Sequence, residues 1–298
     1  MGKKRSREDG KDDTAANADD DWVDEDVDEE EDFDVLQVEF EWFNFDPKID
    51  FHGVKSLMRQ LFDVDHSFIN TSALADLILS QPTIGSTVKV DGKEYDAYVV
   101  LTVLNTFVHR EKEPMKQMLK YLTEKAQTNE SLAMIADLLN SDKHIGLVLS
   151  ERLINIPSEI APPLYSMLID EIEAAVEDKE PYEFSHYLIL SKAYLEVEST
   201  LDVEKRKKKK PREEGTTFFF HLEDEIFHKF ALAYGNFTYT NEDEAAADSK
   251  RAFQEAGIKT AGHMILIEAG KLRAAQKAIA EHFKVPERQS NLTRHDKH

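Results

Sequence analysis

The sequence predicts an α/β (α+β) protein, a single domain in which a mixed central sheet is flanked by helices. Apolar or aromatic runs of strand length alternate along the chain with stretches whose apolar residues recur at helical spacing. Tight-turn dipeptides join some strands as hairpins and helices separate others, a combination typical of a mixed sheet. We find no internal repeat and no linker, so one folded domain over residues 35–285 is expected.

Residues 1–34 are expected to form a disordered acidic tail. They carry sixteen acidic and five basic side chains, a net charge of −11 out of −22 for the whole chain. Repulsion between these charges opposes compaction. Two interpretations stay open, a solubilising tail and a clamp for a basic partner. The acidic side chains assigned to partner binding are Asp19, Asp20, Asp21, Asp24, Glu25, Asp26, Glu29 and Glu30.

The first half of the domain should alternate strands with amphipathic helices. Residues 38–45, VEFEWFNF, alternate aromatic with polar side chains and predict a strand. Asp91-Gly92 is favoured where both turn residues need positive φ, and it predicts a hairpin. The segments around these two signals are assigned from their periodicity. Helices are predicted over 51–62, 72–80, 114–125 and 132–139, and the hairpin arms over 87–90 and 95–105.

The stretch at 145–165, IGLVLSERLINIPSEIAPPLY, is expected to be the centre of the domain. The apolar run 145–149 predicts a buried strand, which polar Ser150, Glu151 and Arg152 interrupt. Ser158 is expected to cap a helix that ends near Val176. A helix N-terminus after a buried strand offers free N–H groups, so many α/β proteins bind a ligand at such a place.

The last third of the chain is predicted to be rich in strands. The run KRKKKKPREEG at 205–215 predicts an exposed loop, because neighbouring ammonium groups repel and need water. Residues 286–298 are expected to fray. The other predicted elements are strands over 184–197, 218–220, 231–240 and 264–267, and helices over 223–229 and 270–283.

Composition excludes several classes of protein. The chain has no cysteine, which excludes disulfides, thiolate zinc sites and a cysteine nucleophile. It has no apolar run of about 18 residues, so no transmembrane helix is expected, and its N-terminus is too charged for a secretory signal. The net charge of −22 repels phosphate backbones, so we expect basic proteins rather than nucleic acid or membranes as partners.

Motifs that carry catalysis or metal binding are absent. The chain contains no phosphate-binding G-x-x-x-x-G-K-[ST] or G-x-G-x-x-G, no G-x-S-x-G and no H-E-x-x-H. His186, His221 and His228 are therefore interpreted as structural histidines. The acidic run 223–225 is interpreted as a solvated helix start rather than a catalytic pair. We predict no catalytic, cofactor-binding or metal-binding residue.

Two groups of charged residues have more than one interpretation. Glu151 and Arg152 form either a buried ion pair that fixes the turn or an exposed recognition point; we favour the ion pair and keep both residues as partner-binding candidates. The basic run 205–212 is a solvated loop, a nuclear-import signal or a partner for the acidic tail. Its nuclear-import candidates, supported by a second basic patch at residues 3–7, are Lys207, Lys208, Lys209 and Lys210.

Several stretches together resemble the BCCIP family, named for interaction with a breast-cancer susceptibility protein and a cyclin-kinase inhibitor. They are VEFEWFNFDPKIDFHGVKSLMRQLF, ALADLILSQPTIGSTVK, GLVLSERLINIPSEIAPPLY, FSHYLILSK and FFFHLEDEIFHKFAL, spread over residues 35–285. The resemblance implies a protein that shuttles between nucleus and cytoplasm. It implies a chaperone of a basic large-subunit ribosomal protein, with links to nuclear export of a phosphoinositide kinase and to transport receptors. It also implies a fold similar to the GCN5-related acetyltransferase fold.

Those acetyltransferases hold the pyrophosphate of coenzyme A in a glycine-rich turn, where N–H groups approach the phosphates without interference from Cβ atoms. The matching turn here, SERLINIPS at 150–158, has no glycine and contains Pro157, which has no N–H to donate. We therefore expect no cofactor and a non-enzymatic chaperone and transport adaptor that supports ribosome biogenesis. The alternatives are a divergent acyl-coenzyme A-dependent N-acyltransferase and a scaffold for DNA-repair or cell-cycle proteins.

Overall fold

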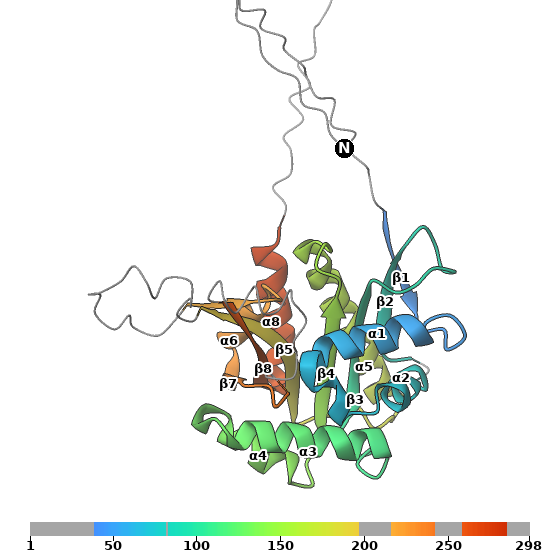
Figure 1. Cartoon of the computed structure of the whole chain (residues 1–298). Helices are drawn as coiled ribbons and strands as arrows, with labels where there is room; N and C mark the ends of the chain where they lie inside the picture. The colour runs from blue at the N-terminus through green and yellow to red at the C-terminus, as the bar shows by residue number, and fades with distance from the viewer. Residues whose placement is uncertain (1–38, 82, 197–215, 242–257, 285–298) are drawn as a thin grey trace, which may run out of the picture. The chain divides into compact units, whose positions relative to one another are not determined.

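The computed structural model describes residues 39–81, 83–196, 216–241 and 258–284. Its centre is an eight-stranded sheet in the order β1-β2-β3-β4-β5-β8-β7, with β6 paired to β5 off this path (Figure 1). The pair β4–β5 is parallel and the other pairs are antiparallel. The predicted mixed sheet flanked by helices is therefore confirmed, whereas the likeness to the GCN5-related acetyltransferase fold stays a prediction.

The strands and helices alternate along the described chain. The strands are β1 (Phe40–Asn44), β2 (Ser86–Val90), β3 (Val99–Asn105), β4 (Ile145–Arg152), β5 (His186–Glu196), β6 (Thr217–Phe219), β7 (Ala231–Phe237) and β8 (Ile258–Glu268). The helices are α1 (Phe51–Phe62), α2 (Thr71–Leu79), α3 (Glu113–Gln127), α4 (Ala133–Leu139), α5 (Ala161–Glu177), α6 (Asp224–His228) and α8 (Ala269–His282). Short 3₁₀ helices are η1 (Asp63–Phe68), η2 (Glu130–Leu132) and η3 (Ser158–Ile160).

Each face of the sheet has its own layer of helices. The helices α1 to α4 cover one face and form an apolar core with it, and α5, α6 and α8 cover the other face (Figure 1). Strand β3 shows the alternation that this requires, because Val100 and Leu104 belong to the first core and Leu101 and Val103 to the second. The central strands are thus buried on both faces, as their near-continuous apolar sequences indicate.

The hairpin prediction is confirmed in its turn and wrong in its second arm. Asp91 and Gly92 both have positive φ, 66° and 109°. The β2–β3 ladder, however, begins only at the pair Val88–Val99, so the connection reaches to residue 98. The prediction placed the start of the strand at Tyr95 because aromatic residues are common in strands, but Tyr95 lies exposed in this connection.

Two strands are longer than predicted. β4 continues through its polar end because Ser150, Glu151 and Arg152 pair with residues 99–101 of β3. β8 begins at Ile258 rather than Met264 because it pairs with β5 along its whole length. In both cases a neighbouring strand supplies hydrogen bonds that the apolar pattern of the strand itself does not reveal.

The helix after β4 starts differently from the prediction. Residues 158–160 form η3, and the N-cap positions of η3 and α5 are Pro157 and Ile160, so Ser158 occupies neither. The helix α5 itself begins at Ala161 with Pro162 in its first turn, a position where a missing N–H costs nothing. Proline geometry therefore replaces the expected serine cap.

Several predictions fall outside the described residues. They are the acidic tail 1–34, the start of order near Val35, the basic loop 205–215, the segment 242–256 and the C-terminal residues from 286 onward. Within the described ranges, no helix combines the length and the apolarity that crossing a bilayer requires.

Candidate functional site

The parallel strands β4 and β5 separate half-way along their length. They pair only from Ile145–His186 to Leu149–Leu190. Beyond that point β4 remains with β3, and β5 remains with β8. Because β8 occupies one edge of β5 throughout, β6 must pair with β5 on the edge that β4 has left. We call this opening, between residues 150–158 on one side and β6 with residues 220–222 on the other, the fork.

A buried ion pair crosses the fork from β4 to the start of α6. Arg152 donates from Nη1 to Glu223 Oε1 at 2.6 Å and from Nη2 to Oε2 at 3.1 Å. Both side chains are buried. Burial alone would lower the pKa of Arg152, but the carboxylate of Glu223 outweighs it and the net direction is upward. Two parallel hydrogen bonds between the guanidinium and the carboxylate fix the orientation of both side chains.

A second ion pair joins β4 to β5 at the base of the fork. Lys192 Nζ lies 2.7 Å from Glu151 Oε2, and both side chains are largely shielded from water. Gln60 of α1 donates to Glu151 Oε1 at 2.9 Å and to the carbonyl of Arg152 at 2.8 Å. Burial raises the pKa of Glu151, while Lys192 and Gln60 act in the opposite direction. This pair replaces the main-chain bonds that β4 and β5 no longer make.

The acidic run at the start of α6 is not solvated, and the prediction for it is wrong. Glu223 and Asp224 are buried, and only Glu225 is exposed. Burial, and then the charge of Glu223, raises the pKa of Asp224 well above its usual range. Ser191 of β5 donates a hydrogen bond to Asp224 at 2.5 Å. The desolvation arises from β4 and β5, which are distant in sequence, so the local run could not reveal it.

His221 lies between the two ion pairs and acts as a neutral spacer. It is buried, with Nε2 3.8 Å from Glu151 Oε1, beyond hydrogen-bond distance. Burial, with Arg152 and Lys192 nearby, lowers its pKa well below the usual value. The structural interpretation of this histidine agrees with that environment.

These groups suit cross-linking better than catalysis or cofactor binding. The carboxylates of Glu151 and Glu223 are paired with Lys192 and Arg152, and Asp224 is buried and accepts a hydrogen bond from Ser191. The turn after β4 presents Ile154 and Pro157 where a coenzyme would need free N–H groups at a helix start. The residues present therefore do not fit a coenzyme A pyrophosphate.

Above the ion pairs, the fork opens to the surface as an apolar groove of about 230 Å³. Its two walls are the turn after β4 and the segment from β6 to α6. Arg152 contributes the charged end of its floor. The lining residues are Arg152, Leu153, Ile154, Ile156, Ser158, Tyr194, Phe219, Phe220 and Leu222.

The candidate partner-binding residues divide between two places. The eight acidic residues assigned to partner binding, all within the segment 19–30, and the basic residues Lys207 to Lys210 lie outside the described residues. Glu151 and Arg152 are both buried in ion pairs. The sequence suggested that these two side chains pair with each other, but each pairs with a residue elsewhere in the chain. Neither is placed to contact a partner protein directly. A recognition role for these two side chains is therefore not supported by their positions.

Sequence reasoning missed the partners of those two residues. Glu223, Lys192 and Gln60 each lie on a separate element. The one local signal was Lys192, a charged residue inside the apolar strand LILSKAYL. A lysine at such a position requires a carboxylate partner, although its sequence does not say which one.

A histidine pair contacts β6, because the rings of both His228 and His263 pack against that of Phe219. His263 of β8 donates from Nδ1 to Asn236 Oδ1 at 2.6 Å, so its Nε2 accepts from His228 Nε2 at 2.8 Å. Burial lowers the pKa of His228 to about 4. Burial and the neighbouring His228 lower that of His263 to about 3. The described residues hold no cluster of three or more metal-ligating side chains, and the structural interpretation of His228 stays a prediction.

This pair predicts a loss of stability in mild acid. Below about pH 6.5 these two histidines bind protons in the unfolded chain but remain neutral in the folded protein. The free energy of unfolding therefore falls as the pH approaches about 4. His263→Gln should reduce this loss by about 1 kcal/mol or more per pH unit. Urea unfolding between about pH 7 and about pH 4.5 measures it. The exposed His282→Gln is the control, and equal pH slopes for both variants would contradict the assignment.

The family model for BCCIP matches residues 35–227, which include α1, the whole of β4 and the fork. This chain belongs to the BCCIP family. The BCCIP match covers more than half of the chain, and it confirms the resemblance seen in the sequence. The family name does not refer to a catalytic activity.

Named fungal relatives agree with membership in the BCCIP family. Protein BCP1 of Gibberella zeae is 67% identical over 283 residues, covering 95% of this chain and 99% of the relative. Protein bcp1 of Schizosaccharomyces pombe is 43% identical over 245 residues, covering 79% and 86%. Neither name states a partner or a reaction.

A solved structure supports the fold. The crystal structure of BCP1 from Saccharomyces cerevisiae superposes with a TM-score of 0.57 and covers 86% of this chain and 97% of that one. The two sequences are 24% identical, so this likeness concerns the fold of the BCCIP family and no particular site.

Proposed function

We propose that this chain is a non-enzymatic nuclear chaperone and transport adaptor. It binds a basic large-subunit ribosomal protein, keeps it from aggregation and unwanted RNA contacts, and supports nuclear export of cargo and ribosome biogenesis. It is localised in the nucleus and shuttles to the cytoplasm. The BCCIP resemblance is the source of the ribosomal client, of the phosphoinositide kinase and of the transport receptors as expected partners.

The observation that carries the proposal is the acidic excess. The net charge of −22 is divided equally between residues 1–34 and the rest of the chain, so the folded part is acidic as well as the tail. Such a charge attracts cationic proteins over a distance and speeds their encounter, while specificity comes from contacts with a folded surface. A basic ribosomal protein has the matching charge.

The arrangement of the fork supports a binding protein over an acyltransferase. An acyl-coenzyme A enzyme needs free N–H groups at the helix start to hold the pyrophosphate. Here the turn after β4 has no glycine and contains Pro157, which has no N–H to donate. Titration of the full chain with coenzyme A in a calorimeter would show saturable heat if the acyltransferase alternative held.

Co-purification tests the proposal. The full chain and a variant in which the eight predicted partner-binding acids of the segment 19–30 are changed to their amides are purified from cells, and bound ribosomal proteins are identified by mass spectrometry. We expect one stoichiometric large-subunit protein, retained by both forms at about 0.15 M salt, where charges are screened beyond about 8 Å. Many basic proteins, all lost from the amide variant, would mean that the tail is only a polyanion and would contradict the proposal.

A further inference from the structure

The groove of the fork carries the most exposed large apolar side chain that the structure describes. Ile154, at the tip of the turn after β4, is 83% exposed, and Leu222 on the opposite wall is 49% exposed. Phe219 and Phe220 line the same groove. Scattered single apolar residues are ordinary on a surface, but two on facing walls of a groove indicate a contact site. The volume, about 230 Å³, is below the usual range of small-molecule pockets and suits a protein side chain.

One wall of the groove is also a free strand edge. Glu196 donates to the carbonyl of Thr216 at 3.0 Å, and Phe220 donates to that of Lys192 at 3.1 Å. In an antiparallel pair the intervening residues point their N–H and C=O groups the other way, so Thr217 and Phe219 direct theirs away from β5 and toward the fork. Among the described strands, β6 pairs with β5 alone. Such an edge can accept an extended peptide as an added strand.

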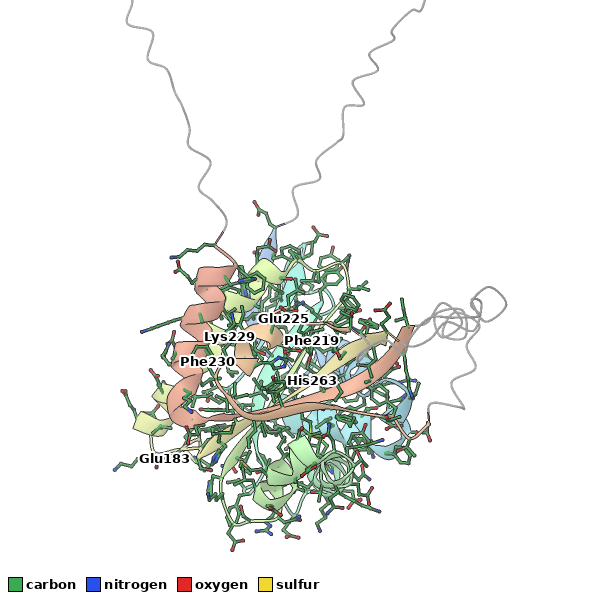
Figure 2. All side chains as sticks on the ribbon, turned by 90° about the vertical axis from the view of Figure 1, so that its left-hand side faces the viewer. Glu183, Phe219, Glu225, Lys229, Phe230 and His263 are labelled. Atoms are coloured by element: carbon green, nitrogen blue, oxygen red, sulfur yellow. The ribbon has the colours of Figure 1, made fainter. Side chains whose placement is uncertain are left out.

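The charge around the groove selects the kind of peptide. Arg152 and Lys192 are buried and neutralised by their carboxylate partners. On the described segments that bound the fork, residues 150–160 and 216–226, the exposed charged side chains are Glu159 and Glu225, and both are acidic. The exposed Lys229 follows at the end of α6. Figure 2 shows Glu225 of α6 on the same side of the molecule as Phe219 of β6.

We propose that the fork binds an extended segment of a partner protein in which a bulky apolar side chain is flanked by lysines or arginines. The segment adds to the free edge of β6, places its apolar side chain between Ile154 and Leu222, and directs its basic side chains to Glu159 and Glu225. Identifying this partner as the ribosomal client rests on the proposed function. The binding mode itself rests on the groove, the edge and the charges.

A peptide-binding experiment tests the fork with the full chain. The probe is a short fluorescein-labelled peptide with Leu-Val-Leu at its centre and alternating Lys and Arg on both sides, followed by fluorescence polarisation. A second peptide replaces the centre by Ser-Gly-Ser and keeps every charge. We expect the apolar-centred peptide to bind at least about tenfold more tightly, because only it fills the groove. Equal affinities would overturn the proposal.

The variant Ile154→Asp separates apolar contact from charge. It removes the exposed apolar wall but adds a negative charge, so a purely electrostatic site would bind the basic peptide more tightly. We expect instead about tenfold weaker binding. Met134→Asp, an equally drastic change at an exposed side chain of α4, should leave affinity unchanged. Unaltered or tighter binding by Ile154→Asp would overturn the proposal.

The fold and the client are controlled separately. Both substituted side chains are at least half exposed, so thermal unfolding of each variant should match that of the parent chain. Methyl NMR spectra of isoleucine-labelled protein should show the Ile154 signal shifting on addition of the apolar-centred peptide; an unmoved signal would contradict the site.

If the ribosomal client co-purifies with Ile154→Asp as with the parent, the chaperone function stands and the fork is not its binding site. If the peptide binds the fork and no client co-purifies, the fork stands and the chaperone function fails.

Discussion

Replacing Arg152 by alanine is expected to lower the free energy of unfolding by about 3–5 kcal/mol. The guanidinium lies 2.6 Å from the carboxylate of Glu223, and both side chains are within the protein. Alanine leaves the carboxylate buried without a cation, and also opens the fork at the base of the groove. Urea unfolding followed by circular dichroism measures the loss.

The control is an arginine–aspartate ion pair at the surface. Arg110 lies 3.0 Å from Asp142, with both side chains exposed, and Arg110→Ala should cost less than about 1 kcal/mol. The double variant Arg152→Met, Glu223→Leu should recover most of the stability, because it removes both charges together. Equal losses for Arg152→Ala and Arg110→Ala would show that the buried pair contributes no more than a solvated one.

Asp65→Ala is the second substitution with a large expected effect, about 3–5 kcal/mol. The carboxylate is fully buried and accepts hydrogen bonds from the backbone N–H groups of Thr240 and Asn241 at 2.8–2.9 Å and from the hydroxyl of Tyr121 at 3.0 Å. Lys125 lies 2.9 Å from it. Alanine leaves two main-chain donors without their acceptor just after β7, and it leaves the Lys125 ammonium without a counter-ion, although Lys125 still donates to the carbonyl of Thr238 and the hydroxyl of Thr240.

Two measurements identify this mechanism. Urea unfolding gives the total loss, and hydrogen exchange at Thr240 and Asn241 reports the freed amides directly. Asp65→Asn keeps an acceptor oxygen and should fall between Asp65→Ala and the parent chain. The exposed Asp137→Ala should have almost no effect. Unchanged exchange at the two amides in Asp65→Ala would contradict the expected role.

Periodicity predicted the helices well because the residues of each apolar face recur at regular spacing within the helix's own sequence. The limits of α1 are those predicted, and α2 differs by one residue at each end. The failures occur where a distant strand provides what the local sequence lacks. The polar start of β8, IKTAG, becomes a strand because β5 lies beside it, and no period in those residues indicates this.

The candidate site was located by sequence and misjudged in its details. The stretch after Leu149 was expected to matter, and it does form one wall of the fork. Its charged residues, Glu151 and Arg152, were interpreted as an ion pair with each other or as an exposed recognition point. Their true partners, Lys192 and Glu223, lie 41 and 71 residues away along the chain, a separation that one sequence without its fold cannot resolve.

The β5–β6 hairpin is closed by its own backbone where it enters the fork, through the bond from Glu196 to Thr216. The ends of the intervening segment are thereby held together whatever its length. Each doubling of the length of such a loop adds only about 0.6 kcal/mol to the free-energy cost of closing it. The length of the connection between these strands can therefore vary in evolution, or accept an inserted reporter domain, while the sheet on either side stays the same.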